Sequence, residues 1–247
     1  MPAHRLDETQ ILVTLRRLRD RIDERFPGSG LGHVAADLLQ IGDETAALVA
    51  YLGRPNWPIR IAVGAVIAII GAVLVAAALS VRMPAGIDGL GAFAQATESA
   101  INDLVFLGIA IFFLVSLEDR IKRRRALAAL HRLRSVAHIV DMHQLTKDPE
   151  RLLSPQADTA SSPTRSLTGP ELGRYLDYCS ELLSLISKLA ALHVQRFNDG
   201  VTLGAVNEIE GLCGGLSNKI WQKITLLDRA ASGRPSPSAD GVRAPSS

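Results

Sequence analysis

The feature that most constrains this chain is an uninterrupted apolar run from Ile59 to Val81, IRIAVGAVIAIIGAVLVAAALSV. It holds 23 residues, and its only charged one is Arg60. A helix rises about 1.5 Å per residue, so the run would measure roughly 35 Å, enough to cross a hydrocarbon core of about 30 Å. We therefore predict a first transmembrane helix at residues 57–82. The N-terminus, MPAHRLDETQ, lacks the apolar region of a signal peptide, so we expect this helix to stay in the mature protein.

A second apolar run, Leu104–Leu117, is shorter, and the charges around it indicate its orientation. Extended back to Ala100 it spans about 27 Å as a helix. Residues 83–99 contain no Lys or Arg, whereas a basic cluster follows the run: Arg120, Lys122, Arg123, Arg124 and Arg125. Cytoplasmic loops carry the excess of basic residues. We predict a second transmembrane helix at 100–117, a short extracytoplasmic connector at 83–99, and both termini in the cytoplasm.

Helical periodicity marks the rest of the chain. Residues 1–56 contain two apolar seams separated by a Pro–Gly break, which predicts an αα-hairpin with coiled-coil-like spacing. The seams are Ile11, Leu15, Leu18 and Ile22, then Val34, Leu38, Ile41, Thr45, Leu48 and Leu52. Residues 118–146 predict a helix that extends the second span, and residues 169–231 predict a C-terminal helix pair.

The remaining segments predict no regular structure. Residues 147–168 are rich in Pro, Ser and Thr, which is typical of a surface loop, and residues 232–247 are typical of a disordered tail. The predicted fold class is therefore all-α: a two-span transmembrane helical hairpin with a cytosolic helical bundle built from the N- and C-terminal helix pairs. Arg outnumbers Lys and Ala is abundant, so we expect a bacterial protein of the cytoplasmic (inner) membrane.

Two surfaces are candidate contact sites. The basic cluster at residues 120–125 is placed to bind anionic lipid headgroups. A stripe of small residues in the first span, Gly64, Ala68, Ala72 and Ala76, would let a second helix or a second copy approach closely. No pattern indicates nucleic-acid binding, because aromatic residues do not alternate with the basic ones.

The sequence contains no motif that predicts catalysis, and we assign no catalytic, cofactor-binding or metal-binding residues. The one polar cluster is His131, His138, Asp141 and His143, whose spacing differs from the i, i+4 pairs of helical metal sites. His193, Cys179 and Cys213 fall on apolar seams, which favours a place in the core. Asn102 and Asp103 are expected to be exposed at the outer interface, with an ion path as the alternative.

These observations favour a non-enzymatic membrane scaffold or adaptor whose cytosolic bundle binds protein partners. One alternative is a small oligomeric channel or transport accessory subunit that uses the small-residue stripe. Another is a metal- or pH-responsive membrane regulator that uses the cluster from His131 to His143.

Overall fold

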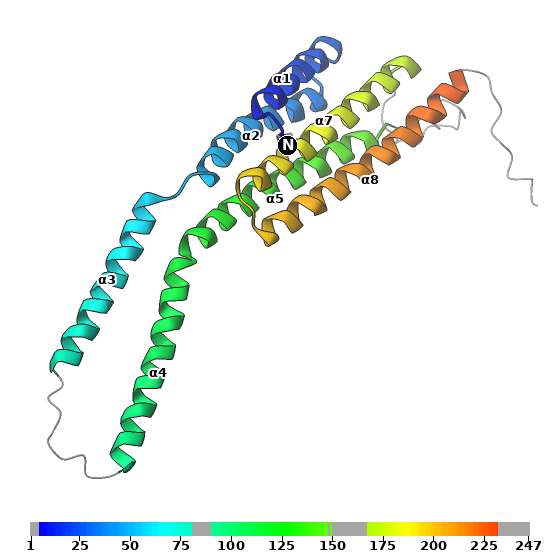
Figure 1. Ribbon diagram of the computed structural model, residues 1–247. Coiled ribbons are helices and arrows are strands. Elements are labelled where there is room, and N and C mark those ends of the chain that lie inside the picture. Colours follow the sequence, from blue (N-terminus) through cyan, green and yellow to red (C-terminus); the bar gives the residue numbers. More distant parts are fainter. Residues whose placement is uncertain (1–4, 81–89, 148, 150–166, 232–247) are drawn as a thin grey trace, which may run out of the picture. The chain divides into compact units, whose positions relative to one another are not determined.

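The structure, a computed structural model, describes residues 5–80, 90–147, 149 and 167–231 (Figure 1). Its regular elements are all α-helices, and none of the described residues lies in a β-strand. The all-α prediction is thus confirmed for this part of the chain. Residues 1–51 and 126–247 form one compact unit, the bundle unit, and residues 52–125 form a second, the apolar unit. Residues 81–89, most of the 147–168 loop and the 232–247 tail lie outside the described residues.

The bundle unit begins with two helices joined by a short turn. α1 (Glu8–Arg25) starts after Asp7, whose carboxylate accepts hydrogen bonds from the backbone N–H groups of Thr9 and Gln10 at 2.8 and 3.4 Å. This cap satisfies donors that the first helical turn leaves free. The turn into α2 (Gly30–Leu52) contains Gly28 at φ +69°, a conformation in which a side chain would be strained.

α7 (Gly169–Arg196) packs against both α1 and α8 (Gly200–Ala231). At its start the carboxylate of Glu171 accepts a hydrogen bond from the Thr168 backbone N–H at 2.8 Å. Its two apolar stripes are both buried, including Leu183 and Leu189. A helix that is apolar on two sides needs neighbours on both, so α7 occupies the middle of the bundle unit.

The core of the bundle unit draws on helices from both ends of the chain. The larger part of α5 (Leu117–Leu145) contributes Leu130 and Leu133, which join one apolar cluster with residues of α1, α2, α7 and α8. Phe26, at the end of α1, packs edge-on against Tyr175 and Tyr178 of α7, with ring centroids 5.4 and 6.2 Å apart. The predicted helical bundle is therefore confirmed.

The apolar unit contains α3 (Trp57–Ser80) and α4 (Leu90–Val115), which lie side by side (Figure 1). One stripe of each helix is partly covered: Val63, Ile67 and Ile70 on α3, and Leu107, Ile111 and Leu114 on α4. The spacing of 4 and 3 puts each trio on one helical face, so these faces form the contact between the two helices. Of the other large apolar side chains described on α3 and α4, Ile59 is half-buried and the rest are exposed, among them Ile69 and Phe106.

α4 begins ten residues earlier than the span predicted at 100–117, so the second half of the predicted connector is helical. Residues 92–100 contain neither Gly nor Pro, and nothing in them opposes helix extension. At the other end Ser116 separates α4 from α5, and its hydroxyl donates a hydrogen bond to the Phe113 carbonyl at 3.0 Å. Such a side-chain bond to the preceding turn is a common cause of a helix bend.

Among the described residues, one helical stretch, within Gly30–Val73, is long and apolar enough to cross a membrane by length and composition. No part of its most apolar window is buried inside the protein. A signal sequence near the N-terminus passes the same test, and the apolar part of α4, Leu104–Val115, is shorter than the test requires. The structure thus supports one possible span, and the two-span arrangement stays a prediction.

Candidate functional site

The strongest polar site of the apolar unit surrounds Glu118, which is buried in the first turn of α5. Its Oε1 accepts hydrogen bonds from the backbone N–H of Asn56 at 3.0 Å and from Lys122 Nζ at 2.8 Å. Its Oε2 accepts a hydrogen bond from Arg60 Nε at 2.7 Å. Lys122, itself buried, also donates to the backbone carbonyl of Arg54 at 2.8 Å. The site therefore joins the start of α3 to the start of α5.

Electrostatics hold the Glu118 carboxylate in its charged form. Burial by itself favours the neutral acid, but hydrogen bonds from Lys122, Arg60 and the Asn56 N–H outweigh it and lower the pKa of Glu118 to about 2. Asn56 precedes the first turn of α3, where the partial positive charge of the helix dipole also favours an anion. A carboxylate held in this way stays ionised at neutral pH, so Glu118 acts as an anchor and not as a proton carrier.

This site changes the interpretation of the basic cluster at residues 120–125. Lys122 is buried and bonded to Glu118 and Arg54, so it does not face a lipid headgroup. The Arg120 guanidinium lies over the Phe113 ring, 4.4 Å from its centroid, where it borders the exposed apolar surface. Arg124 and Arg125 are exposed. From the sequence we grouped Lys122 with the neighbouring basic residues and did not single out Glu118. The spacing of four residues between Glu118 and Lys122 places both on one face of a helix and would have indicated this ion pair.

The small-residue stripe of α3 lies on an exposed face. Gly64, Ala68, Ala72 and Ala76 are all exposed, and a Cβ added at Gly64 would meet nothing within 4 Å. The residues that contact α4 belong to another face of the helix, so the stripe does not mediate the contact between α3 and α4.

The structure does not gather the predicted histidine cluster into one site. His131 and His138 are exposed on α5, whereas His143 is half-buried against the start of α2, where a Cβ added to Gly30 would clash with its Cε1 atom. Asp141 accepts a hydrogen bond from the Gln144 side chain at 2.6 Å. No three His, Cys, Asp or Glu side chains among the described residues are placed to hold a metal ion.

The other polar residues singled out from the sequence lie apart from this site. His193 is fully buried in α7; its Nδ1 is 3.2 Å from the carbonyl oxygens of Leu189 and Ala190, and its Nε2 has no hydrogen-bond partner among the described residues. Burial lowers the pKa of His193, although those two backbone bonds favour the charged ring. Cys179 and Cys213 are buried free thiols. Asn102 is exposed on α4, and the side chain of Asp103 is outside the description.

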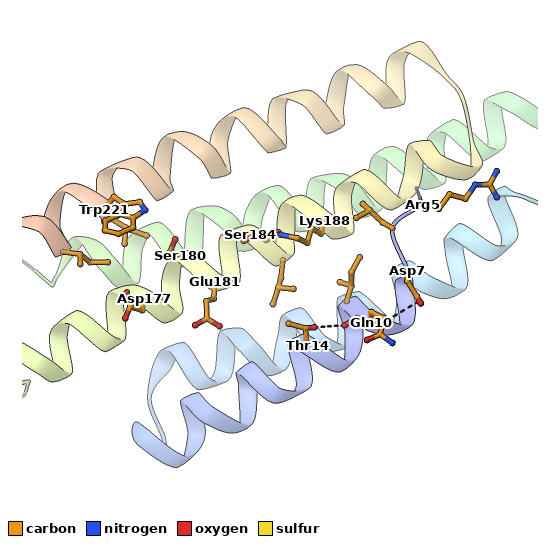
Figure 2. A pocket seen from close by; sticks show the side chains of 15 residues that line it. Arg5, Asp7, Gln10, Thr14, Asp177, Ser180, Glu181, Ser184, Lys188 and Trp221 are labelled. Atoms are coloured by element: carbon orange, nitrogen blue, oxygen red, sulfur yellow. Dashed lines mark hydrogen bonds between the residues drawn. The ribbon is translucent and has the colours of Figure 1, made fainter. Parts of the chain in front are cut away.

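The bundle unit contains a groove that the sequence did not predict (Figure 2). Its cavity volume is about 700 Å³, its floor is α7, and its sides are α8 and α1 with the residues just before it. Ile11, Leu185, Ile220 and Ile224 supply apolar lining, and Trp221, 63% exposed, stands at one end. Ser180 and Ser184 occupy the floor, and their small side chains leave the space open.

Comparison with known proteins supplies no family: no protein-family model matches the chain, and no curated protein or solved structure is significantly similar to it.

Proposed function

We propose that this protein is a membrane-anchored scaffold or adaptor. In this proposal α3 and α4 cross the bilayer as a two-span hairpin, both termini are cytoplasmic, and the bundle unit binds protein partners. The observation that carries it is the outward position of large apolar side chains all along α3 and α4. Those described as exposed are Trp57, Ile61, Val66, Ile69, Val73, Val75, Leu79, Ile101, Leu104, Val105, Phe106, Ile109, Phe112, Phe113 and Val115.

A surface of this kind needs an apolar solvent. Soluble monomers rarely expose contiguous apolar patches larger than a few hundred Å², whereas here the exposed apolar residues run along both helices. With 26 residues, α4 measures about 39 Å, which exceeds the hydrocarbon thickness of about 30 Å even though its strictly apolar part is short. Length and exposure together therefore favour two spans.

Charge supports the proposed orientation. Arg54 and Arg60 flank the start of α3, and Arg120, Arg124 and Arg125 follow the end of α4, so the basic residues described in the apolar unit gather at one end, and Arg82, which follows α3 in the sequence, lies outside the described residues. The Glu118 site lies at that same end and joins the start of α3 to the start of α5. We place this end at the cytoplasmic interface, where the exposed arginines meet anionic headgroups.

Labelling of introduced thiols tests the topology. Burial raises the pKa of the Cys179 and Cys213 thiols to about 12 and about 11, so they contribute little background at neutral pH. We expect a membrane-impermeant maleimide to label Ala85→Cys from the outer side, and to label Asn207→Cys, on α8, only after the membrane is opened. Labelling of Asn207→Cys in intact spheroplasts, or of neither position, would contradict the two-span topology.

Proximity labelling from the C-terminus tests the scaffold role. An enzyme tag after Ser247 should label a reproducible set of cytoplasmic or inner-membrane proteins. The matched control is the isolated segment 52–125 carrying the same tag, which keeps the proposed anchor and lacks the bundle unit. Equal labelling by both would show that the bundle unit recruits nothing.

The exposed stripe at Gly64, Ala68 and Ala72 favours a second candidate, a small oligomeric channel in which α3 contacts α3 of another copy. Against it, the exposed side chains described at residues 61–79 of α3 and 104–115 of α4 are apolar and offer no polar lining for a pore. The molecular mass of the detergent-solubilised protein decides between the two, because a strict monomer excludes the channel.

A further inference from the structure

We infer that the groove of the bundle unit binds one amphipathic helix of a partner protein, with the acidic C-terminal end of that helix against Lys188 and Arg5. This inference rests on the proposed scaffold function and names the class of partner.

The shape of the groove fits a single helix. Three helices bound it, and α1 and α8 both pack against the α7 floor. Along α7 the lining extends from Asp177 to Lys188, about 16 Å or three helical turns. Leu185, Ile11 and Ile220 form its buried apolar base, and the apolar lining that stays accessible is Leu6 just before α1, 38% exposed, and Trp221 and Ile224 on α8. An incoming helix with an apolar stripe would cover these accessible side chains, as in other helix-in-groove complexes.

The charges of the groove favour one direction for that helix. Its acids already have partners: Glu181 binds Arg21 at 2.5 Å, Asp177 binds Arg174 at 3.5 Å, and Asp7 caps α1. Among the described residues no carboxylate lies within ion-pair distance of Lys188 or Arg5, and Lys188 donates only to Ser184, with Nζ 2.6 Å from the hydroxyl. The groove thus presents two cations that lack an anion.

Those two cations lie toward the same end of the groove, away from Trp221 (Figure 2). Cations stabilise the C-terminal end of a helix, where the partial charge is negative. A partner helix with its C-terminus there runs parallel to α7 and antiparallel to the two helices at the sides. Acidic side chains in its last turn would complete ion pairs with Lys188 and Arg5.

Trp221 supplies the anchor at the opposite end. Its side chain is largely exposed on α8 beside Ile220 and Ile224, both of which line the groove. Tryptophans of this kind dominate binding energy when a partner desolvates them. The chain has one other tryptophan, Trp57, so Trp57→Phe leaves Trp221 as the only tryptophan fluorophore.

The test uses the full Trp57→Phe chain in nanodiscs and two stapled helical peptides of about 14 residues with one apolar stripe and one composition. One peptide carries two Glu in its last turn, and the other carries them in its first turn. We expect the first to shift Trp221 emission to the blue and to bind roughly fivefold more tightly than the second. Trp221→Tyr, followed by competition against a labelled peptide, should weaken binding more than tenfold.

Charge reversal sharpens the test. Lys188→Glu should abolish the preference for the peptide with Glu in its last turn over the peptide with Glu in its first turn. A peptide with Lys in its last turn should bind the Lys188→Glu variant more tightly than the peptide with Glu in its last turn does. The control is Lys219→Glu on α8, an exposed lysine that does not line the groove and should change nothing. Equal binding of both peptides, no shift with either, or a shift with dodecanoate and none with the peptides would overturn the inference. Thiol labelling of the same protein separates these outcomes from failure of the proposed membrane topology.

Discussion

In the bundle unit most large aliphatic side chains face inward, whereas in the apolar unit most of those described face outward. Leu183 of α7 is fully buried, and Ile69 of α3 is 63% exposed. Conversely, the Arg134–Glu208 ion pair of the bundle unit lies at the surface, and the Glu118–Lys122 pair of the apolar unit is buried. One chain therefore contains two opposite solutions to the placement of apolar and charged groups.

The difference fits the proposed membrane anchor. Burial of apolar area drives folding in water, so the bundle unit has the side-chain distribution of a water-soluble domain. Lipid tails are as apolar as Leu, so a helix pair in a bilayer gains nothing by hiding its apolar residues and must instead satisfy its charges internally. The Glu118 site does this where the proposed membrane helices meet water.

The largest expected effect comes from truncating a bundle core residue. Leu183→Ala should lower the free energy of opening by about 2–5 kcal/mol, because it leaves a cavity among fully buried neighbours. The matched change in the apolar unit, Ile69→Ala, should cost below about 1 kcal/mol in nanodiscs, since lipid fills the space. Hydrogen exchange of the α7 and α3 amides measures both, and equal costs would contradict the contrast between the units.

Removing the buried charge of the apolar unit should have the next largest effect. Glu118→Gln leaves Lys122 without its anion, and the fall in the pKa of Glu118 from 4.5 to about 2 corresponds to about 3 kcal/mol of stabilisation. That contribution is complete above about pH 4.5 and is lost as the pH falls through about 2. The Asn56 amide should lose its protection from exchange, whereas Asp119→Asn, at an exposed neighbour, should leave it protected.

Acid should weaken the bundle unit at a higher pH than it weakens the Glu118 site. Burial lowers the pKa of His193, and burial together with the nearby Lys147 lowers that of His143. The unfolded chain then binds more protons, so stability is complete above about pH 6.5 and is lost as the pH falls below it. Thermal unfolding at about pH 7.5 and pH 5 should show the loss, and His193→Gln should reduce it. Substitution of the exposed His138 is the control; if it reduces the loss equally, His193 is not the cause.

The smallest expected effect belongs to the surface ion pair. Arg134 and Glu208 are 3.0 Å apart with both side chains largely exposed, so Glu208→Gln should cost no more than about 1 kcal/mol. Raising the salt concentration should remove even that difference, whereas the effect of Glu118→Gln should persist in salt. If the loss of stability caused by Glu208→Gln persisted at high salt, the Arg134–Glu208 pair would stabilise the protein as a buried ion pair does.

Local patterns allowed much of the fold to be predicted. The 4, 3 spacing of Ile11, Leu15 and Leu18 predicts a helix and its buried face, because helical geometry places such residues together. The two apolar stripes of α7 likewise predict its central place. α4 begins ten residues before the span predicted at 100–117, since helix-compatible residues extend the helix beyond the apolar run from which that span was predicted.

The candidate sites depended on contacts that spacing does not encode. The sequence by itself determined that the chain is helical, where its apolar seams lie, and that two of its runs differ in character from the rest. The tertiary structure alone decided that Glu118 meets Arg60 and the Asn56 amide, that the α3 stripe turns away from α4, and that Ser180 and Ser184 form the floor of a groove. The physical reason is that periodicity fixes which face of a helix is apolar, whereas the partner of each face and of each charge depends on residues distant in the sequence.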